Sequence, residues 1–368
     1  MALGVASKLT FRLRPSALIF VLSVTGACAA GTATTGTFDT GGGTNAGGSG
    51  GAPSSSQSGT GAGDVGGGTF TTSGSGTGGA APVDFAAYAH TGKALYTIDP
   101  MAPSAAPKLV GNFDCIGGTG QDGAMTDLAV NQSGEIWGIS DKKIYKLTIE
   151  GTTVHCDKTI TLPNPNAVFY GLTFAPAGVL DDTTKEVLVA GNTAGQLWSV
   201  DTTNGTLAQH GTFGNVPAND GHGHNYDNKG KAWELSGDIV FLANGGNPVG
   251  FAAVRDCPNP PSTSGCNPTD TLIAIDMTKL KSVGSQSVTL KVRGQMVKSP
   301  GCSGADSAYE RMLGIAAWND KVYGFSHNSA IVEIDNDDGS ACLVASTPNV
   351  FWNGAGVTTL APVIKPPE

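Results

Sequence analysis

Leu197-Trp198-Ser199-Val200-Asp201 is one of five copies of a short pattern in this sequence. Each copy has an apolar residue, two variable positions, a second apolar residue and, in four of the copies, Asp. Such a segment is typical of a β-strand that ends in a turn. Its recurrence at blade-sized intervals predicts a repeat architecture. The other copies begin at Leu95, Ile144, Leu272 and Ile331, so the intervals are 49, 53, 75 and 59 residues.

A second apolar element lies upstream of the pattern and is also found five times. Its copies align on a central Leu or Ile that follows a small or short polar residue. The innermost strand of a propeller blade needs small residues, because the inner strands of all blades crowd around one axis. We therefore interpret these elements as inner strands. The residues before the central position are Asp127, Gly171, Asp238, Gly314 and Thr359.

The two ends of the repeat complement each other. The last inner element, 358–361, has no later strand to pair with, and the first pattern, Leu95 to Asp99, has no inner element before it. Joining them makes one complete blade, closes the ring and removes open sheet edges. The sequence thus predicts an all-β protein with a five-bladed β-propeller. Beside the shared blade, the others span about 122–163, 168–214, 232–298 and 310–352; six blades remain an alternative, because the fourth unit is long.

The cysteines support this register. Cys115 and Cys302 stand ten positions before Met125 and Met312, in two different blades, and each has a partner about forty residues later. We expect the disulfides Cys115–Cys156 and Cys302–Cys342, with Cys257–Cys266 closing a third loop. A metal cluster or catalytic thiols are the alternative, although no CxxC occurs.

The N-terminus has the layout of a secretory signal, with three basic residues followed by a short apolar run. Gly26-Ala27-Cys28 is similar to the lipobox of bacterial lipoproteins, in which the Cys is lipidated, but Thr25 departs from the branched aliphatic residue expected there. Ala27-Cys28-Ala29 also fits an ordinary cleavage site that would release a secreted protein. We expect a signal peptide over 1–27, a lipid-anchored Cys28 with a disordered Gly/Ser/Thr-rich linker over 28–81, and the propeller over 82–368.

Signal, linker and repeats together resemble bacterial exported lipoproteins with a propeller head. The resemblance implies a cell-envelope or surface protein, membrane-anchored through lipid, that binds a surface protein or a glycan. The formal net charge of −9 argues against nucleic acid as a partner. We expect a monomer, and no cofactor is predicted.

The longest insertions fall on one predicted face of the ring, which favours a binding surface there. The candidate residues on it are Asp220, His222, His224, Asn225, Asp227, Asp306, Glu310 and Arg311.

Two further hypotheses concern chemistry. His222 and His224, two positions apart, could bind a divalent metal, although the pattern is weak, a third ligand would have to come from elsewhere, and a solvated polar loop is the alternative. Asp127 and Asp238 occupy equivalent positions in two blades and, with Glu310, could form the carboxylates of a glycosidase-like hydrolase or lyase at the channel. The alternative is that each Asp binds backbone amides of its own blade.

Overall fold

The computed structural model describes residues 86–163, 167–180, 183–262, 264–302 and 309–362. All of them belong to one compact unit, Thr69–Glu368. Their regular structure is twenty β-strands and two short 3-10 helices, η1 (Asn244–Gly246) and η2 (Lys279–Lys281), which confirms the all-β prediction. The predicted signal peptide, Cys28, the linker and Asp306 lie outside the described residues. Within the described part, no helix is long and apolar enough to cross a lipid bilayer.

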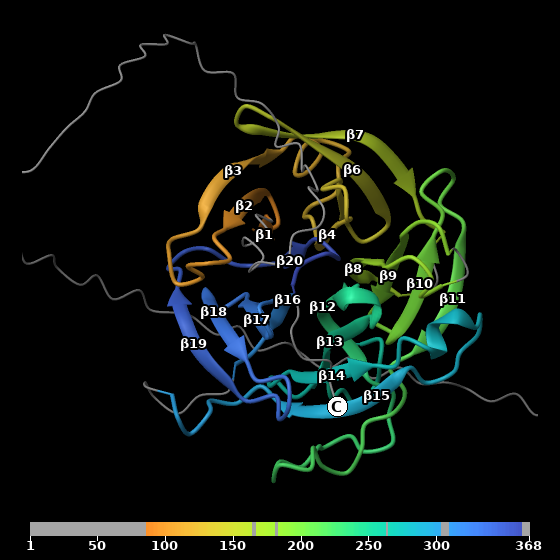
Figure 1. The fold of residues 1–368 in the computed structure, drawn as a ribbon, viewed down its shortest axis with the longest axis vertical. Coiled ribbons are helices and arrows are strands. Elements are labelled where there is room, and N and C mark those ends of the chain that lie inside the picture. The colour runs from red at the N-terminus through yellow and green to blue at the C-terminus, as the bar shows by residue number, and fades with distance from the viewer. Residues whose placement is uncertain (1–85, 164–166, 181–182, 263, 303–308, 363–368) are drawn as a thin grey trace, which may run out of the picture. The chain divides into compact units, whose positions relative to one another are not determined.

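The strands form five four-stranded antiparallel blades around a common centre (Figure 1). Four blades use consecutive strands and agree with the predicted boundaries. The second blade contains β4 (Asp127–Val130), β5 (Ile136–Ile139), β6 (Lys143–Glu150) and β7 (Thr153–Thr161). The third contains β8 (Phe169–Ala175), β9 (Val187–Asn192), β10 (Gln196–Val200) and β11 (Leu207–Thr212). The fourth contains β12 (Glu234–Leu242), β13 (Val249–Arg255), β14 (Thr271–Ile275) and β15 (Thr289–Gln295), and the fifth contains β16 (Met312–Trp318), β17 (Lys321–Ser326), β18 (Ala330–Ile334) and β19 (Ala341–Ser346).

The first blade joins the two ends of the described chain. It contains β1 (Ala87–His90), β2 (Ala94–Ile98) and β3 (Lys108–Phe113), and its inner strand is β20 (Gly354–Val357). β20 pairs antiparallel with β1, so that His90 lies opposite Gly354. The predicted ring closure is therefore confirmed.

The position of the closing strand was predicted wrongly. We expected it over 358–361, but β20 ends at Val357, and Leu360 is 49% exposed. The physical reason lies at Gly354. A Cβ added there would lie 2.3 Å from His90 Nε2 and 2.4 Å from Asp127 Oδ1. Only a residue without a side chain fits between the neighbouring strands at the axis.

Adjacent blades are also connected at the outer rim. The end of β3 pairs in parallel with the start of β7, which merges the first two blades into one eight-stranded sheet. Parallel bridges Thr212↔Ser287 and Lys298↔Ala341 repeat this connection between later blades. The contact is close: a Cβ at Gly294 of β15 would lie 1.9 Å from the carbonyl oxygen of Asp338. In these places an outermost strand packs against the start of the outermost strand of the next blade or against the turn that precedes it.

The three predicted disulfides are present. Cys115–Cys156 ties the loop before β4 to β7, and Cys302–Cys342 ties the loop before β16 to β19. Cys257–Cys266 closes the connection between β13 and β14. Because disulfides persist in oxidising compartments, they indicate an extracytoplasmic location.

Candidate functional site: the loop face and the closed axis

The connections between strands alternate between the two faces of the ring. One face carries the links between the second and third strand of each blade and the links from one blade to the next. We call it the loop face. Its longest segments are 114–126, 213–233, 256–270, 296–311 and 347–353. The predicted binding residues that the structure describes belong to the second and fourth of these segments. In Figure 1 the segment 213–233 extends well beyond β15.

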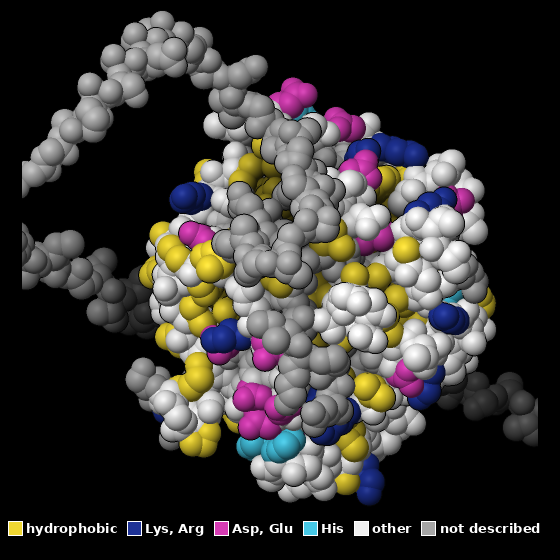
Figure 2. All heavy atoms as spheres, viewed as in Figure 1, with side chains coloured by type: hydrophobic (Ala, Val, Ile, Leu, Met, Phe, Trp, Pro, Cys, Tyr) yellow, Lys and Arg dark blue, Asp and Glu magenta, His cyan; other side chains and the backbone are white. Residues whose placement is uncertain are grey.

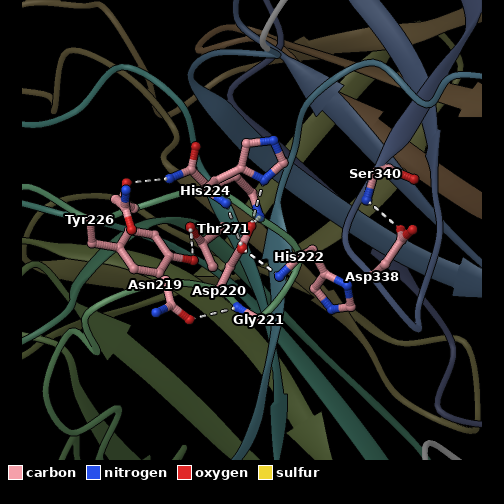
Figure 3. Close-up of polar contacts among 11 residues, drawn as sticks. Asn219, Asp220, Gly221, His222, His224, Tyr226, Thr271, Asp338 and Ser340 are labelled. Carbon is pink, nitrogen blue, oxygen red and sulfur yellow. Dashed lines mark hydrogen bonds and ion pairs between the residues drawn. The ribbon is translucent and has the colours of Figure 1, made fainter.

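Asp220 organises the segment 213–233 (Figure 3). Its Oδ1 accepts hydrogen bonds from the backbone N–H groups of His222, at 2.8 Å, and His224, at 3.0 Å. Its Oδ2 lies 2.7 Å from His224 Nδ1 and 3.3 Å from the backbone nitrogen of Gln295. Burial alone would raise the pKa of Asp220, but the hydrogen bonds from His222 and His224 outweigh it and hold that pKa below its usual value. Asp220 is therefore a structural carboxylate, with both oxygens occupied.

The side chains of the two histidines have different surroundings. His224 Nδ1 is hydrogen-bonded to Asp220, and 40% of the His224 side chain is exposed. The His222 ring lies over Gly294, beside the backbone of Asp338. In the space-filling view, histidines adjoin acidic side chains at the lower edge of the molecule (Figure 2).

The described residues bring no third metal ligand to these histidines. Among the described residues, the groups with three metal-ligand atoms close together are Asp114 with Cys115 and Cys156, and Glu234 with Cys257 and Cys266. Their cysteines form disulfides, and neither group includes His222 or His224. The structure therefore does not assemble the predicted histidine metal site from the described residues.

Asn225 and Asp227 hold the same loop through their backbones. The backbone oxygen of Asn225 accepts a hydrogen bond from Gln295 Nε2 at 3.2 Å. The backbone N–H groups of Asp227 and Asn228 donate to the carboxylate of Asp256. Asp256 begins the Cys257–Cys266 connection and is 1% exposed. Since Asp256 connects two long loops by hydrogen bonds, the backbone that carries their exposed side chains is held in one conformation.

Glu310 and Arg311 lie where the fourth blade passes to the fifth. Glu310 pairs with Thr269 and accepts a hydrogen bond from Ser326 Oγ at its backbone oxygen, at 2.7 Å. Burial raises the pKa of nearby Asp270 to about 6, and the charge of Glu310 adds to that effect. Arg311 is exposed and has a φ of 53°, a left-handed conformation that is uncommon for a residue with a side chain.

Asp127 and Asp238 meet at the axis of the ring. Asp127 Oδ2 accepts a hydrogen bond from the backbone nitrogen of Leu172 at 2.6 Å, and Asp238 Oδ2 accepts one from Ile315 at 2.8 Å. Each carboxyl group thus fastens the inner strand of the following blade. The two carboxyl groups also lie close enough to affect each other's ionisation. Burial raises the pKa of Asp238 to about 8, and burial together with the charge of Asp238 raises the pKa of Asp127 well above its usual value.

His90 completes this buried group. Its Nε2 lies 4.0 Å from Asp127 Oδ1, and its Nδ1 lies 2.9 Å from the backbone oxygen of Thr91. Burial lowers the pKa of His90 to about 4, so the ring is neutral at pH 7.

The predicted catalytic group is not assembled. Asp127 and Asp238 have no exposed surface. Glu310 lies beside Thr269 and Asp270 instead of joining them. Among the described residues the inner strands touch one another around Gly354, and they leave the two carboxyl groups no exposed surface that a substrate could reach. What the sequence did indicate correctly is that the two Asp residues approach each other.

Sequence reasoning missed His90, Asp256 and Asp270. His90 has a positional signal, since it stands just before the first strand pattern and therefore at the end of a second strand. Asp256 and Asp270 flank the Cys257–Cys266 connection, and short polar residues at both ends of an insertion are typical of side chains that bind backbone amides.

Comparisons with known proteins add the following. No family model matches this sequence, and no curated protein matches it significantly. Among solved structures, a protein of unknown function from Bacteroides caccae is 11% identical, with 74% of this chain and 98% of that chain covered and a TM-score of 0.39. The Dos1 propeller is 10% identical, with 70% and 53% covered and a TM-score of 0.32. BBS1N, in complex with ARL6DN, is 10% identical, with 60% and 48% covered and a TM-score of 0.25. These similarities concern the fold, and the functional argument depends on the geometry of this chain alone.

Proposed function

We propose that this chain is an exported, lipid-anchored binding protein that recognises a surface protein or a glycan through its loop face. One observation carries the proposal: the long insertions gather on one face and are fixed there by buried carboxylates. Asp220 and Asp256 each bind backbone N–H groups of the segment 213–233. Loops that are ordered before binding lose less conformational entropy when a partner binds.

The direction of the closing strands supports a tethered arrangement. β1 runs toward the loop face, because it ends at the connection 91–93, and β20 runs away from it, because it follows the connection 347–353. The described chain therefore enters and leaves the ring on the face opposite the loop face. A linker that precedes β1 would consequently be attached on the face opposite the loop face.

Binding to intact producing cells tests this function. The full chain without its signal, labelled with a fluorophore, is expected to bind saturably, and unlabelled chain should compete. Replacing 217–229 by a Gly/Ser linker of equal length should remove most of the binding. Replacing the opposite-face turn 201–206 in the same way is the matched control and should not. Equal binding by both loop variants would contradict the proposal.

The anchor is tested separately. Mass spectrometry of the mature N-terminus is expected to find an acylated Cys28, and Cys28→Ser should release the chain into the medium. An unmodified N-terminus at Ala30 would refute lipidation and leave the binding proposal standing.

A further inference from the structure

Phe351 is a large aromatic residue on the loop face, and its side chain is exposed to solvent. It lies between β19 and β20 and is 54% exposed. The next residue, Trp352, is fully buried, and its Nε1 donates a hydrogen bond to Thr347 Oγ1 at 2.9 Å. The Trp352 ring packs edge-on against Tyr96 and Phe325. Because Trp352 fixes the backbone, the exposure of Phe351 is a property of a rigid loop.

His327 stands beside this ring. The centroids of the His327 and Phe351 rings are 5.6 Å apart, and the rings are tilted by 38°. His327 Nδ1 lies 3.1 Å from the backbone oxygen of Trp352, which orients the ring and leaves Nε2 for another partner. The segment that carries His327 is itself fixed, since the backbone nitrogen of Thr347 donates to Ser329 at 2.8 Å.

Arg311 is connected to His327 through its backbone and belongs to a third loop. Its backbone oxygen accepts a hydrogen bond from the backbone nitrogen of His327 at 3.0 Å. Its left-handed φ of 53° is maintained by this bond and by the bond from Ser326 to Glu310. Residues with a strained backbone occur more often at ligand-binding sites than elsewhere. Arg311 combines such a backbone with a long, exposed polar side chain.

The surroundings of Phe351 decide which ligand fits. Among the exposed large hydrophobic side chains of the described residues, the other one on the loop face is Val168. A protein interface centres its strongest contacts in a desolvated apolar patch. A single ring among polar groups instead matches a pyranose, which has one apolar face of C–H groups and a rim of hydroxyls.

We infer that Phe351, His327 and Arg311 form a carbohydrate subsite, in which Phe351 stacks on a pyranose ring while His327 and Arg311 bind its oxygen atoms. The inference rests on the proposed binding function and narrows its ligand to a glycan. Loss of the aromatic ring removes the stacking contact, so Phe351→Ala should weaken binding about tenfold or more.

Saturation-transfer NMR and calorimetry on the full chain test this subsite. The probes are tetrasaccharides of glucose, N-acetylglucosamine, galactose and mannose, and one that contains glucuronate. At least one should bind, Phe351→Ala and Arg311→Ala should each weaken it, and Phe351→Trp should preserve it. Leu360→Ala removes a side chain of similar exposure on the opposite face and should have no effect.

The result that overturns the inference is the absence of binding to every probe, or binding that survives both Phe351→Ala and Arg311→Ala in chains whose circular dichroism is unchanged. If cell binding depends on 217–229 but not on Phe351, the proposed function stands and the subsite is refuted. If neither loop variant alters cell binding while a glycan binds through Phe351, the subsite stands and the broader proposal must be revised.

Discussion

Replacing Asp127 by Asn should change how the stability of the protein depends on pH. The two axial carboxyl groups are fully buried and affect each other's ionisation. Two neighbouring carboxylates cannot both be ionised without strong repulsion, so the folded pair retains a proton that the separate groups release on unfolding. Burial raises the pKa of Asp238 to about 8, against 3.8 for an unperturbed Asp.

The sign and size follow from proton linkage. Because the folded state holds more protons than the unfolded state between pH 3.8 and about 8, stability is greatest at the acid end of this range and falls as pH rises through it. One retained proton corresponds to about 1.4 kcal/mol per pH unit. The pKa of His90 is lowered from 6.5 to about 4, so His90 stabilises the fold above pH 6.5 and opposes the carboxyl pair below it. The range from 6.5 to 8 is therefore the clearest one, and about 2 kcal/mol should be lost across it.

Asp127→Asn preserves the hydrogen bond to Leu172, because the amide oxygen can replace Oδ2. The amide N–H group takes the place of Oδ1, which has no hydrogen-bond partner among the described residues. The variant loses the raised pKa of Asp127 but keeps the buried Asp238, so its stability should vary less with pH than that of the wild type between pH 6.5 and 8, without becoming independent of pH. Urea unfolding at several pH values measures this. Asp238→Asn is the contrasting control: both of its oxygens accept backbone N–H groups, so it should be destabilised at every pH. Equal pH slopes for wild type and Asp127→Asn would refute the shared proton.

Three other predictions concern stability and titration. Gly294→Ala places a Cβ against the carbonyl of Asp338 and should cost about 2–3 kcal/mol in urea unfolding. The comparison is Gly221→Ala, where the backbone is left-handed (φ 84°) but a Cβ meets no atom within 4 Å, so this change should cost less; the reverse order would count against the rim contact. Removing the disulfide Cys302–Cys342, whose cysteines are 40 residues apart, should lower the free energy of unfolding by about 4 kcal/mol. Removing Cys257–Cys266, whose cysteines are 9 residues apart, should lower it by about 3 kcal/mol. The shift of the urea midpoint measures both losses, and a larger loss for the shorter loop would contradict the loop-entropy argument. The Asp114 carboxylate, 2.7 Å from His155 Nδ1, raises the pKa of His155 above 6.5. The contact should therefore stabilise the fold below pH 6.5 and weaken as pH rises through the folded pKa. An NMR titration of His155 should find a higher midpoint in wild type than in Asp114→Asn, and equal midpoints would exclude the contact in solution.

The strand pattern predicted the blades because it depends on side-chain alternation. Each copy coincides with the third strand of its blade, from β2 around the ring to β18, and the blade boundaries follow. The closing strand was misplaced because Gly354-Ala355-Gly356-Val357 has little side-chain pattern, while Leu360 offered an apolar residue to align on. Close backbone packing selects glycine, and glycine leaves no periodic signal.

The candidate site was predictable only in part. Equivalent positions in two blades brought Asp127 and Asp238 together, but their complete burial depends on contacts between inner strands of different blades. Asp220 was recognised as polar, yet its structural role depends on Gln295, which is 75 residues away in sequence. Phe351 belongs to no repeat, and an exposed aromatic residue cannot be distinguished from a buried one by sequence pattern alone.

The pairing of β1 with β20 also determines when the molecule can finish folding. During synthesis β1 is made early and its partner β20 is made last. One edge of β1 therefore remains unpaired until nearly the whole described chain has been synthesised. Contacts between such distant segments form slowly, and an unpaired strand edge invites association with other chains. A chain cut short before Gly354 would keep that edge permanently, and we expect it to aggregate even though four of its blades retain every strand.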